Sequence, residues 1–212
     1  MTGLVRKATL IVAGGLLIAG VAGAGVPSPA NSTKPTCISL VGQSGGLADS
    51  LAGKFSVIVR DLVNNPLNGS SVVVDLSGNA DAKLCNAQLS PRYTLNCAAH
   101  TVRAFTDASG TVSFTLVGGG TGSATVLSGT GGKIYADGVL LGNISVSVYD
   151  LDGSTGVGAG DLSQWLTDFG AATNYARSDY DCSGTVGAGD LSLWLTVFGN
   201  ANSSASCTGI CP

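Results

Sequence analysis

The sequence DLDGSTGVGAGDLSQWLTDFG occupies residues 150–170, and DYDCSGTVGAGDLSLWLTVFG occupies residues 179–199. The two stretches are identical at 15 of 21 positions and begin 29 residues apart. Each begins with aspartates at alternate positions and has another aspartate eleven residues after the first. We therefore interpret residues 149–201 as one small module made of two matching halves.

The oxygen-bearing residues of each copy follow the order of a calcium-binding loop. Such a loop takes side-chain ligands from positions 1, 3 and 5, a carbonyl from position 7 and a carboxylate from position 12. The alternative is a Gly/Asp-rich turn that is repeated but binds no metal. The predicted Ca²⁺ ligands are Asp150, Asp152, Ser154, the carbonyl of Gly156 and Asp161 in the first copy, and Asp179, Asp181, Ser183, the carbonyl of Thr185 and Asp190 in the second.

The two loops differ at position 6, where the chain turns sharply and glycine is favoured. The second loop has Gly184 there, whereas the first has Thr155, with Gly156 one place late. Either Thr155 takes the strained turn or the first loop binds more weakly. We expect affinities on the order of 10⁻⁴ M or somewhat tighter, with the second site the stronger.

A short amphipathic helix is predicted after each loop, with a glycine at its C-terminal end. Two such helices could bury their Trp–Leu–Phe faces against each other. The predicted buried faces are Leu162, Trp165, Leu166 and Phe169 in the first copy, and Leu191, Trp194, Leu195 and Phe198 in the second.

This duplicated loop and helix resembles the dockerin family, calcium-binding modules that attach enzymes to cohesin-bearing scaffolds. The resemblance implies a small, α-helical, EF-hand-like module, bound Ca²⁺ and a cohesin-like protein partner. Dockerins usually select the cohesin with hydroxyl residues at loop positions 10 and 11, and often with basic residues early in the helix. Here loop positions 10 and 11 are Ala159–Gly160 and Ala188–Gly189. The matching helix positions are Leu166–Thr167 and Leu195–Thr196. The calcium framework therefore matches, and the usual recognition residues do not.

The N-terminal residues 1–25 are typical of a secretory signal peptide. Arg6 and Lys7 precede an apolar run that ends in Ala22–Gly23–Ala24, an A-x-A cleavage pattern. A retained membrane anchor is the alternative, although the run is short and rich in glycine. We expect a secreted or cell-surface protein of a bacterium or archaeon, with residues 26–36 as a Pro/Ser/Thr-rich linker.

The charge pattern excludes nucleic acid as a partner, since the chain has a net charge of −3 and no basic patch. All of its 13 acidic residues are aspartates. Those in the module face a single basic residue, Arg177, and so would repel one another unless cations neutralise them. The aspartates of the module are Asp150, Asp152, Asp161, Asp168, Asp179, Asp181 and Asp190.

Six cysteines in an exported chain indicate disulfides rather than a zinc site, because no C-x-x-C pair is present. A Cys85–Cys97 bond would close a short loop and stabilise the fold by about 3 kcal/mol. Cys182 is predicted to pair with Cys207 or Cys211 in the tail, residues 202–212. Cys37 would take the remaining cysteine or one on another molecule.

Residues 37–148 have the pattern of an antiparallel β-sandwich, with short Val-, Ile-, Thr- and Phe-rich runs separated by turn signals such as Gly118–Gly119–Gly120. The fold class is therefore mainly β. The predicted strands are Ile38–Val41, Lys54–Leu62, Ser71–Leu76, Thr101–Phe105, Thr111–Leu116, Gly122–Leu127, Lys133–Ala136 and Ile144–Tyr149.

The segments FSVIVRDLVNNPLNGSSVVVDLSG and TDASGTVSFTLVGGGTGSATV resemble the bacterial Ig-like repeats of invasin-type surface proteins. That resemblance implies an Ig-like fold, and such modules serve as spacers, adhesins and polymer subunits. The last strand runs into Asp150 without a linker, so calcium would fix the module against the sandwich.

No catalytic function is expected, because the single histidine, His100, has no serine or cysteine motif around it. A small-molecule substrate is likewise not expected. A carbohydrate-binding module would need exposed aromatic platforms, and both tryptophans are assigned to the helical core. The favoured function is structural or adhesive, with self-assembly into filaments or surface layers, and the alternative is docking to a cohesin-like receptor. Thr33–Val41 is a candidate strand for donation to a neighbouring sheet.

Overall fold

The computed structural model describes residues 25–41, 52–88, 90–122, 131–154, 156–171, 173, 175–199 and 209–211. The signal peptide predicted at residues 1–25 lies outside this range except for Gly25, and the strand predicted at Gly122–Leu127 lies outside it except for Gly122. Within the described ranges, no helix combines the length and hydropathy needed to cross a membrane.

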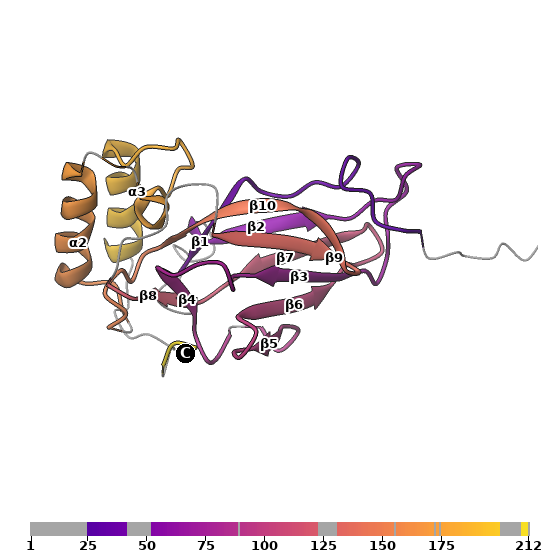
Figure 1. Ribbon diagram of the computed structural model, residues 1–212, viewed down its shortest axis with the longest axis horizontal. Coiled ribbons are helices and arrows are strands. Elements are labelled where there is room, and N and C mark those ends of the chain that lie inside the picture. The colour runs from indigo at the N-terminus through magenta and orange to yellow at the C-terminus, as the bar shows by residue number, and fades with distance from the viewer. Residues whose placement is uncertain are drawn as a thin grey trace, which may run out of the picture.

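The described chain is mainly β, and its two α-helices lie together at one end of the strands (Figure 1). The elements in chain order are β1 (Cys37–Leu40), β2 (Lys54–Ile58), β3 (Ser71–Asp75), β4 (Ala82–Leu84), β5 (Thr94–Asn96), β6 (Thr101–Phe105), β7 (Thr111–Thr115), β8 (Gly118–Gly120), β9 (Gly132–Ala136), β10 (Val139–Val148), α2 (Ala159–Gly170), the 3₁₀ turn η1 (Ala176–Ser178) and α3 (Ala188–Gly199).

Six strands form one sheet in the order β1-β10-β9-β3-β6-β5, while β2 pairs with β7 and β4 pairs with β8. Every pairing is antiparallel except that of β1 with β10, which is parallel. A second parallel bridge joins Val41 to Val117, between β7 and β8. The N-terminal strand therefore connects the large sheet to the segment that carries the smaller pairs, an arrangement that the prediction of a purely antiparallel stack did not include.

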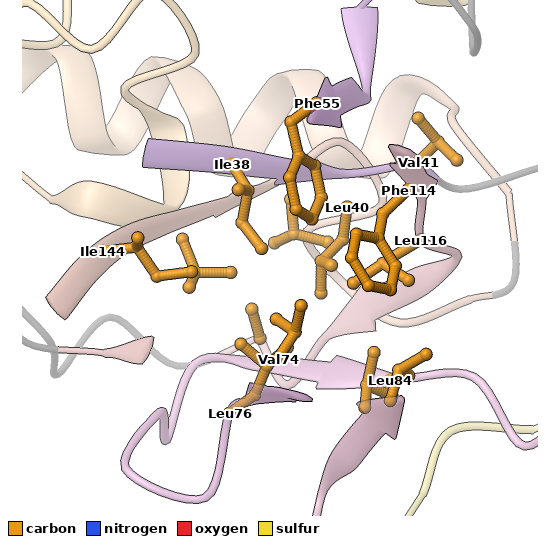
Figure 2. Packing of buried hydrophobic residues seen from close by; sticks show 14 of the residues in the cluster. Ile38, Leu40, Val41, Phe55, Val74, Leu76, Leu84, Phe114, Leu116 and Ile144 are labelled. Atoms are coloured by element: carbon orange, nitrogen blue, oxygen red, sulfur yellow. The ribbon is translucent and has the colours of Figure 1, made fainter. Parts of the chain in front are cut away.

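The core forms by the alternation expected of half-buried strands. Val72 and Val74 of β3 are fully buried, as is Val57 of β2. Figure 2 shows side chains from β1, β2, β3, β7 and β10 meeting in this core. The same cluster of buried residues extends to Trp165 and Trp194 of the helices. The strands and the C-terminal module therefore share one hydrophobic core.

Most of the predicted strands are confirmed, but the prediction of a turn at Gly118–Gly119–Gly120 is wrong. These three glycines form β8, pair with β4 and are buried. A Cβ on Gly118 would lie 2.4 Å from the Lys83 carbonyl oxygen, and one on Gly120 would lie 2.1 Å from that of Leu151. Glycine is present here because neighbouring backbone approaches too closely for any side chain.

The segment predicted as an exportable strand is paired within its own chain. Thr33 bridges Ile58, and residues 37–40 pair along β10 from Ser145 to Val148. Ile38, Leu40 and Val41 are almost fully buried. Residues 26–36, predicted as a linker, also contact the β2 region, where the Ser28 amide donates to the Arg60 carbonyl at 2.7 Å.

One sheet edge is blocked by side chains. On β7 the Tyr93 hydroxyl donates to the Ser113 carbonyl at 3.2 Å and accepts from the Thr115 amide at 3.0 Å. Further along, the Gln88 amide group bonds both the N–H and the carbonyl of Val117, at 2.9 and 2.8 Å. These contacts occupy backbone groups that an added strand would need.

The predicted disulfide pairing is wrong. Cys97 is bonded to Cys211 and not to Cys85, and Cys182 is bonded to Cys37 and not to the tail. Cys85 is also disulfide-bonded, no described cysteine is a free thiol, and Cys207 lies outside the described residues. Sequence spacing misled the prediction because the N-terminal strand lies beside the last strand, which brings Cys37 to the second loop.

Candidate metal centres

The first loop begins where β10 ends. The carbonyl of Asp150 accepts a hydrogen bond from the Gly120 amide at 2.5 Å, and that of Leu151 accepts one from the Gly122 amide at 3.1 Å. Gly153 also lies against this segment, since a Cβ on it would be 2.4 Å from the Gly120 carbonyl oxygen. The backbone around β8 therefore fixes the start of the first loop.

The first loop brings together three of its predicted ligands, Asp150, Asp152 and Asp161. One carboxylate oxygen from each lies within 4.8 Å of the others. Asp161 is fully buried in the first turn of α2, where its carboxylate accepts from the amides of Asp152 at 3.0 Å and Gly158 at 2.6 Å. A carboxylate at this place also faces the positive end of the helix dipole.

The second loop repeats the cluster with Asp179, Asp181 and Asp190, again with three carboxylate oxygens within 4.8 Å of one another. Asp190 is fully buried and accepts from the amides of Tyr180 at 2.6 Å, Asp181 at 3.0 Å and Gly187 at 2.8 Å. Backbone amides therefore hold the last ligand of each loop in a fixed orientation.

The middle of the second loop also has the predicted layout. Asp179 accepts from the amides of Ser183 at 3.0 Å and Gly184 at 2.9 Å. The Ser183 hydroxyl donates to the Thr185 carbonyl at 3.1 Å, so the ligand oxygens predicted at positions 5 and 7 are neighbours. Gly184 has φ +82°, the left-handed turn that favours glycine.

In the first loop, Thr155 lies outside the described residues. The hydroxyl of Ser154 and the carbonyl of Gly156 stay predictions as ligands.

Position 4 of each loop is also left-handed, a feature that sequence reasoning missed. It is Gly153 in the first loop, with φ +70°, and Cys182 in the second, with φ +63°. A residue with a Cβ adopts this conformation at a cost of roughly 1–2 kcal/mol. In the second loop this left-handed residue, Cys182, forms the disulfide with Cys37.

A second missed feature is the glycine at position 11. A Cβ on Gly160 would lie 2.4 Å from Oδ2 of Asp152, and a Cβ on Gly189 would lie 2.4 Å from Oδ2 of Asp181. Comparison with dockerins explains these Ala–Gly pairs only as the loss of recognition residues. In the structure, glycine at position 11 makes room for the carboxylate of position 3.

Burial raises the pKa of two of these carboxyl groups, Asp161 and Asp179. Desolvation is the main cause for both Asp161 and Asp179, and backbone amides oppose it by hydrogen bonding to the charged form. The nearby carboxylates of Asp152, for Asp161, and of Asp190 and Asp181, for Asp179, raise the pKa further. The carboxylates are therefore costly to ionise together without a cation.

The donor chemistry fits calcium. All the predicted ligand atoms are oxygens, which hard cations prefer. Oxygens that coordinate Ca²⁺ at 2.3–2.6 Å lie no more than roughly 4.6–5.2 Å apart, so a spread of 4.8 Å suits one ion in each cluster.

A buried ion pair joins the two halves of the module. The Nε atom of Arg177, in η1, donates to Asp168 of α2 at 2.7 Å, and Nη2 donates to the other carboxylate oxygen at 2.8 Å. The Ser178 hydroxyl donates to the same carboxylate at 2.5 Å. The helix of the first half is thus attached to the turn that leads into the second loop.

The predicted buried face of the helices is correct for the tryptophans and in part for Leu162 and Leu191, which are half-buried against the core. Trp165 and Trp194 are each 1% exposed, and their rings stack on Phe169 and Phe198 at 5.3 and 5.1 Å between centroids. The other four residues of the predicted faces are instead exposed, because the buried stripe lies one position round each helix, at Asp161, Trp165 and Asp168 and at Asp190, Trp194 and Val197. The exposed fractions are 53% for Leu166, 54% for Phe169, 48% for Leu195 and 44% for Phe198.

No protein-family model matches the chain, and no curated protein or solved structure was found to be similar to it. The resemblances to dockerins and to bacterial Ig-like repeats therefore depend on the motifs quoted above. The metal hypothesis depends on those motifs and on the geometry of the two aspartate clusters.

Proposed function

We propose that the chain is a secreted, non-catalytic structural or adhesive protein whose C-terminal module is held in shape by two Ca²⁺ ions. The observation that carries the proposal is the repeated cluster: three carboxylates converge at the same loop positions in both halves. Extracellular calcium would neutralise the negative charge of these clusters, because the buried Arg177 pairs with Asp168, which belongs to neither cluster.

The proposed domains are an Ig-like β-sandwich and an EF-hand-like, dockerin-like module. Alternating burial along the strands supports the first, and a loop whose last aspartate opens a helix supports the second. The contacts between them support a rigid unit. The Tyr180 hydroxyl donates to the Val148 carbonyl at 3.1 Å, and its ring stacks on that of Tyr149 at 4.4 Å.

Calcium would act here as a structural ion. Binding to the folded state alone stabilises it by about 2.7 kcal/mol per site when free calcium is 100 times Kd. We expect the melting temperature of the full chain to rise with calcium and to fall with EDTA. Magnesium is the matched control, because it tolerates this number of protein ligands poorly. An unchanged melting curve in EDTA would reject the metal hypothesis.

For the partner, the exposed leucines and phenylalanines of α2 and α3 support a protein contact through the helical module. Self-assembly is proposed to use this module in end-to-end contacts, since the candidate donor strand is engaged in its own sheet and disulfide-bonded at Cys37. Docking to a cohesin-like receptor is the alternative, and the same exposed residues favour it.

Sedimentation of the mature chain, residues 26–212, distinguishes these partners. We expect calcium-dependent assemblies that dissociate in EDTA and in the variant Leu166→Asp/Leu195→Asp. Leu62→Asp is the control, because Leu62 is 78% exposed on the β domain and so tests the loss of an exposed leucine alone. A monomer in every condition, together with tight binding to a cohesin, would favour the docking function instead.

A further inference from the structure

The second loop is covalently attached to the N-terminal strand. Cys182 lies between the predicted ligands Asp181 and Ser183, at the left-handed position 4. Its disulfide partner, Cys37, is the first residue of β1. The corresponding residue of the first loop is Gly153, which takes a similar φ without a crosslink.

The anchor on the sheet lies in a paired strand with a buried neighbour. Cys37 is in register with Ser145 of β10, and the next residue, Ile38, is 2% exposed. On the loop side, the amide of Ser183 donates both to Asp179 and to Asp181, at 3.0 Å each. The disulfide therefore fixes the loop at a point flanked by two predicted ligands, Asp181 and Ser183, and three residues from Asp179.

We infer that the Cys37–Cys182 disulfide is a positioning element of the second cation site. It holds position 4 in the left-handed conformation that the metal-binding loop needs, before the ion arrives. The conformational entropy of the loop is then lost during folding and not during calcium binding. This raises the calcium affinity of the second site. This inference rests on the proposed calcium function and adds the covalent bond on which one of its two sites depends.

The coupling must be reciprocal, because binding and bond closure act on the same loop. If the disulfide strengthens calcium binding, calcium at the second site shifts thiol–disulfide equilibrium toward the closed bond by the same factor. In that exchange the two protein thiols lose two electrons and two protons to glutathione disulfide, which leaves as two molecules of glutathione.

The first test is isothermal titration of the full mature chain with calcium. Asp161→Ala disables the first site so that the second is measured alone, and Asp190→Ala does the converse. On the first background, Cys37→Ser/Cys182→Ser should lower second-site affinity by about tenfold, the effect of ordering one residue's backbone on binding. Cys37→Ser/Cys182→Gly should recover part of this loss, because glycine takes a positive φ readily. On the Asp190→Ala background, Cys37→Ser/Cys182→Ser should leave the calcium affinity of the first site unchanged.

The other described disulfide supplies the matched control. Cys97–Cys211 spans 114 residues and Cys37–Cys182 spans 145, so removal of either has a similar effect on the entropy of the unfolded chain. Cys97→Ser/Cys211→Ser should leave second-site affinity unchanged. Equal losses in the two serine pairs, or no loss in the Cys37/Cys182 pair, would overturn the inference.

The second test needs no substitution, so it holds even if the variants fail to fold. Wild-type chain is equilibrated in glutathione buffers with calcium or EDTA, and Cys37 and Cys182 are then alkylated and quantified by mass spectrometry. The ratio [GSH]²/[GSSG] at half closure should rise about tenfold with calcium, and an unchanged ratio would contradict the coupling. Absence of calcium binding by the wild-type chain would instead reject the proposed function itself.

Discussion

The two loops share most of their sequence but are attached to the sheet in different ways. The first is held by backbone hydrogen bonds to the segment around β8, where glycines allow close approach. The second is held by a disulfide to β1 and by the Tyr180 hydroxyl. The carboxylates at positions 1, 3 and 12 are the same in both. The two halves therefore share one arrangement of carboxylates in different surroundings.

The two helices also differ in one buried side chain, and the largest predicted effect tests this difference. Asp168 of α2 corresponds to Val197 of α3, and both are buried. Arg177→Met should destabilise the chain by about 3–5 kcal/mol, because it leaves the Asp168 carboxylate buried without its ion-pair partner. Denaturant unfolding gives the free energy change.

Two variants control this prediction. Arg177→Met/Asp168→Val places in the first half the residue that the second half already has, and it should recover most of the loss. Arg103→Met removes an arginine that lies over the Phe105 ring on the sheet surface, and it should change stability by less than about 1 kcal/mol. A loss in the double variant as large as in Arg177→Met would show that the ion pair is not what joins the halves.

The next effect concerns position 11, where the two loops should behave alike. Gly189→Ala places a Cβ against Oδ2 of Asp181, as Gly160→Ala does against Oδ2 of Asp152. Without calcium the flexible carboxylate can move away. With calcium it is held as a ligand, so overpacking of about 1–3 kcal/mol should weaken binding roughly 5- to 150-fold.

Gly187→Ala is the matched control for this change, because a Cβ on Gly187 meets no atom within 4 Å. It should leave calcium affinity unchanged in titration calorimetry. If Gly189→Ala lowered stability in EDTA as much as in calcium, the glycine would serve backbone packing and not the carboxylate.

The smallest effect is a pH dependence of opposite sign with and without calcium. Burial raises the folded-state pKa of Asp161 and Asp179. In EDTA, their contribution to stability is fully present below the unfolded pKa, about 3.9, and is lost as pH rises through the raised folded value. With calcium the ligands must be deprotonated, so stabilisation by the ion should grow as pH rises over the same window. Thermal melts between pH 4 and 6 would measure both slopes, and parallel slopes would contradict the ligand assignment.

Local pattern predicted much of this molecule. The Val-, Ile- and Phe-rich runs at Lys54–Leu62 and Ser71–Leu76 predicted two core strands, and the spacing of aspartates predicted both clusters. The predictions failed where distant segments meet. The pairing of β1 with β10 and the Cys37–Cys182 bond depend on contacts more than 100 residues apart, which composition and period do not encode.

Close packing explains the other failures. A run of three glycines is typical of a turn, and only the approach of Leu40, Lys83 and Leu151 shows why β8 needs it. The helical period correctly indicated an amphipathic face, but its burial is centred on the tryptophans and not on the adjacent leucines. A stripe of apolar residues wider than the core it covers leaves part of itself exposed, and no periodicity defines which part.

The most direct test of the central claim is calcium titration of the metal-stripped full chain by calorimetry, with the two buried aspartates as variants. We predict two binding events of unequal affinity in the wild type. The tighter event should vanish in Asp190→Ala and persist in Asp161→Ala, because Gly184 and the disulfide favour the second loop. Absence of any binding in the millimolar range, or tighter binding at the first loop, would contradict the account.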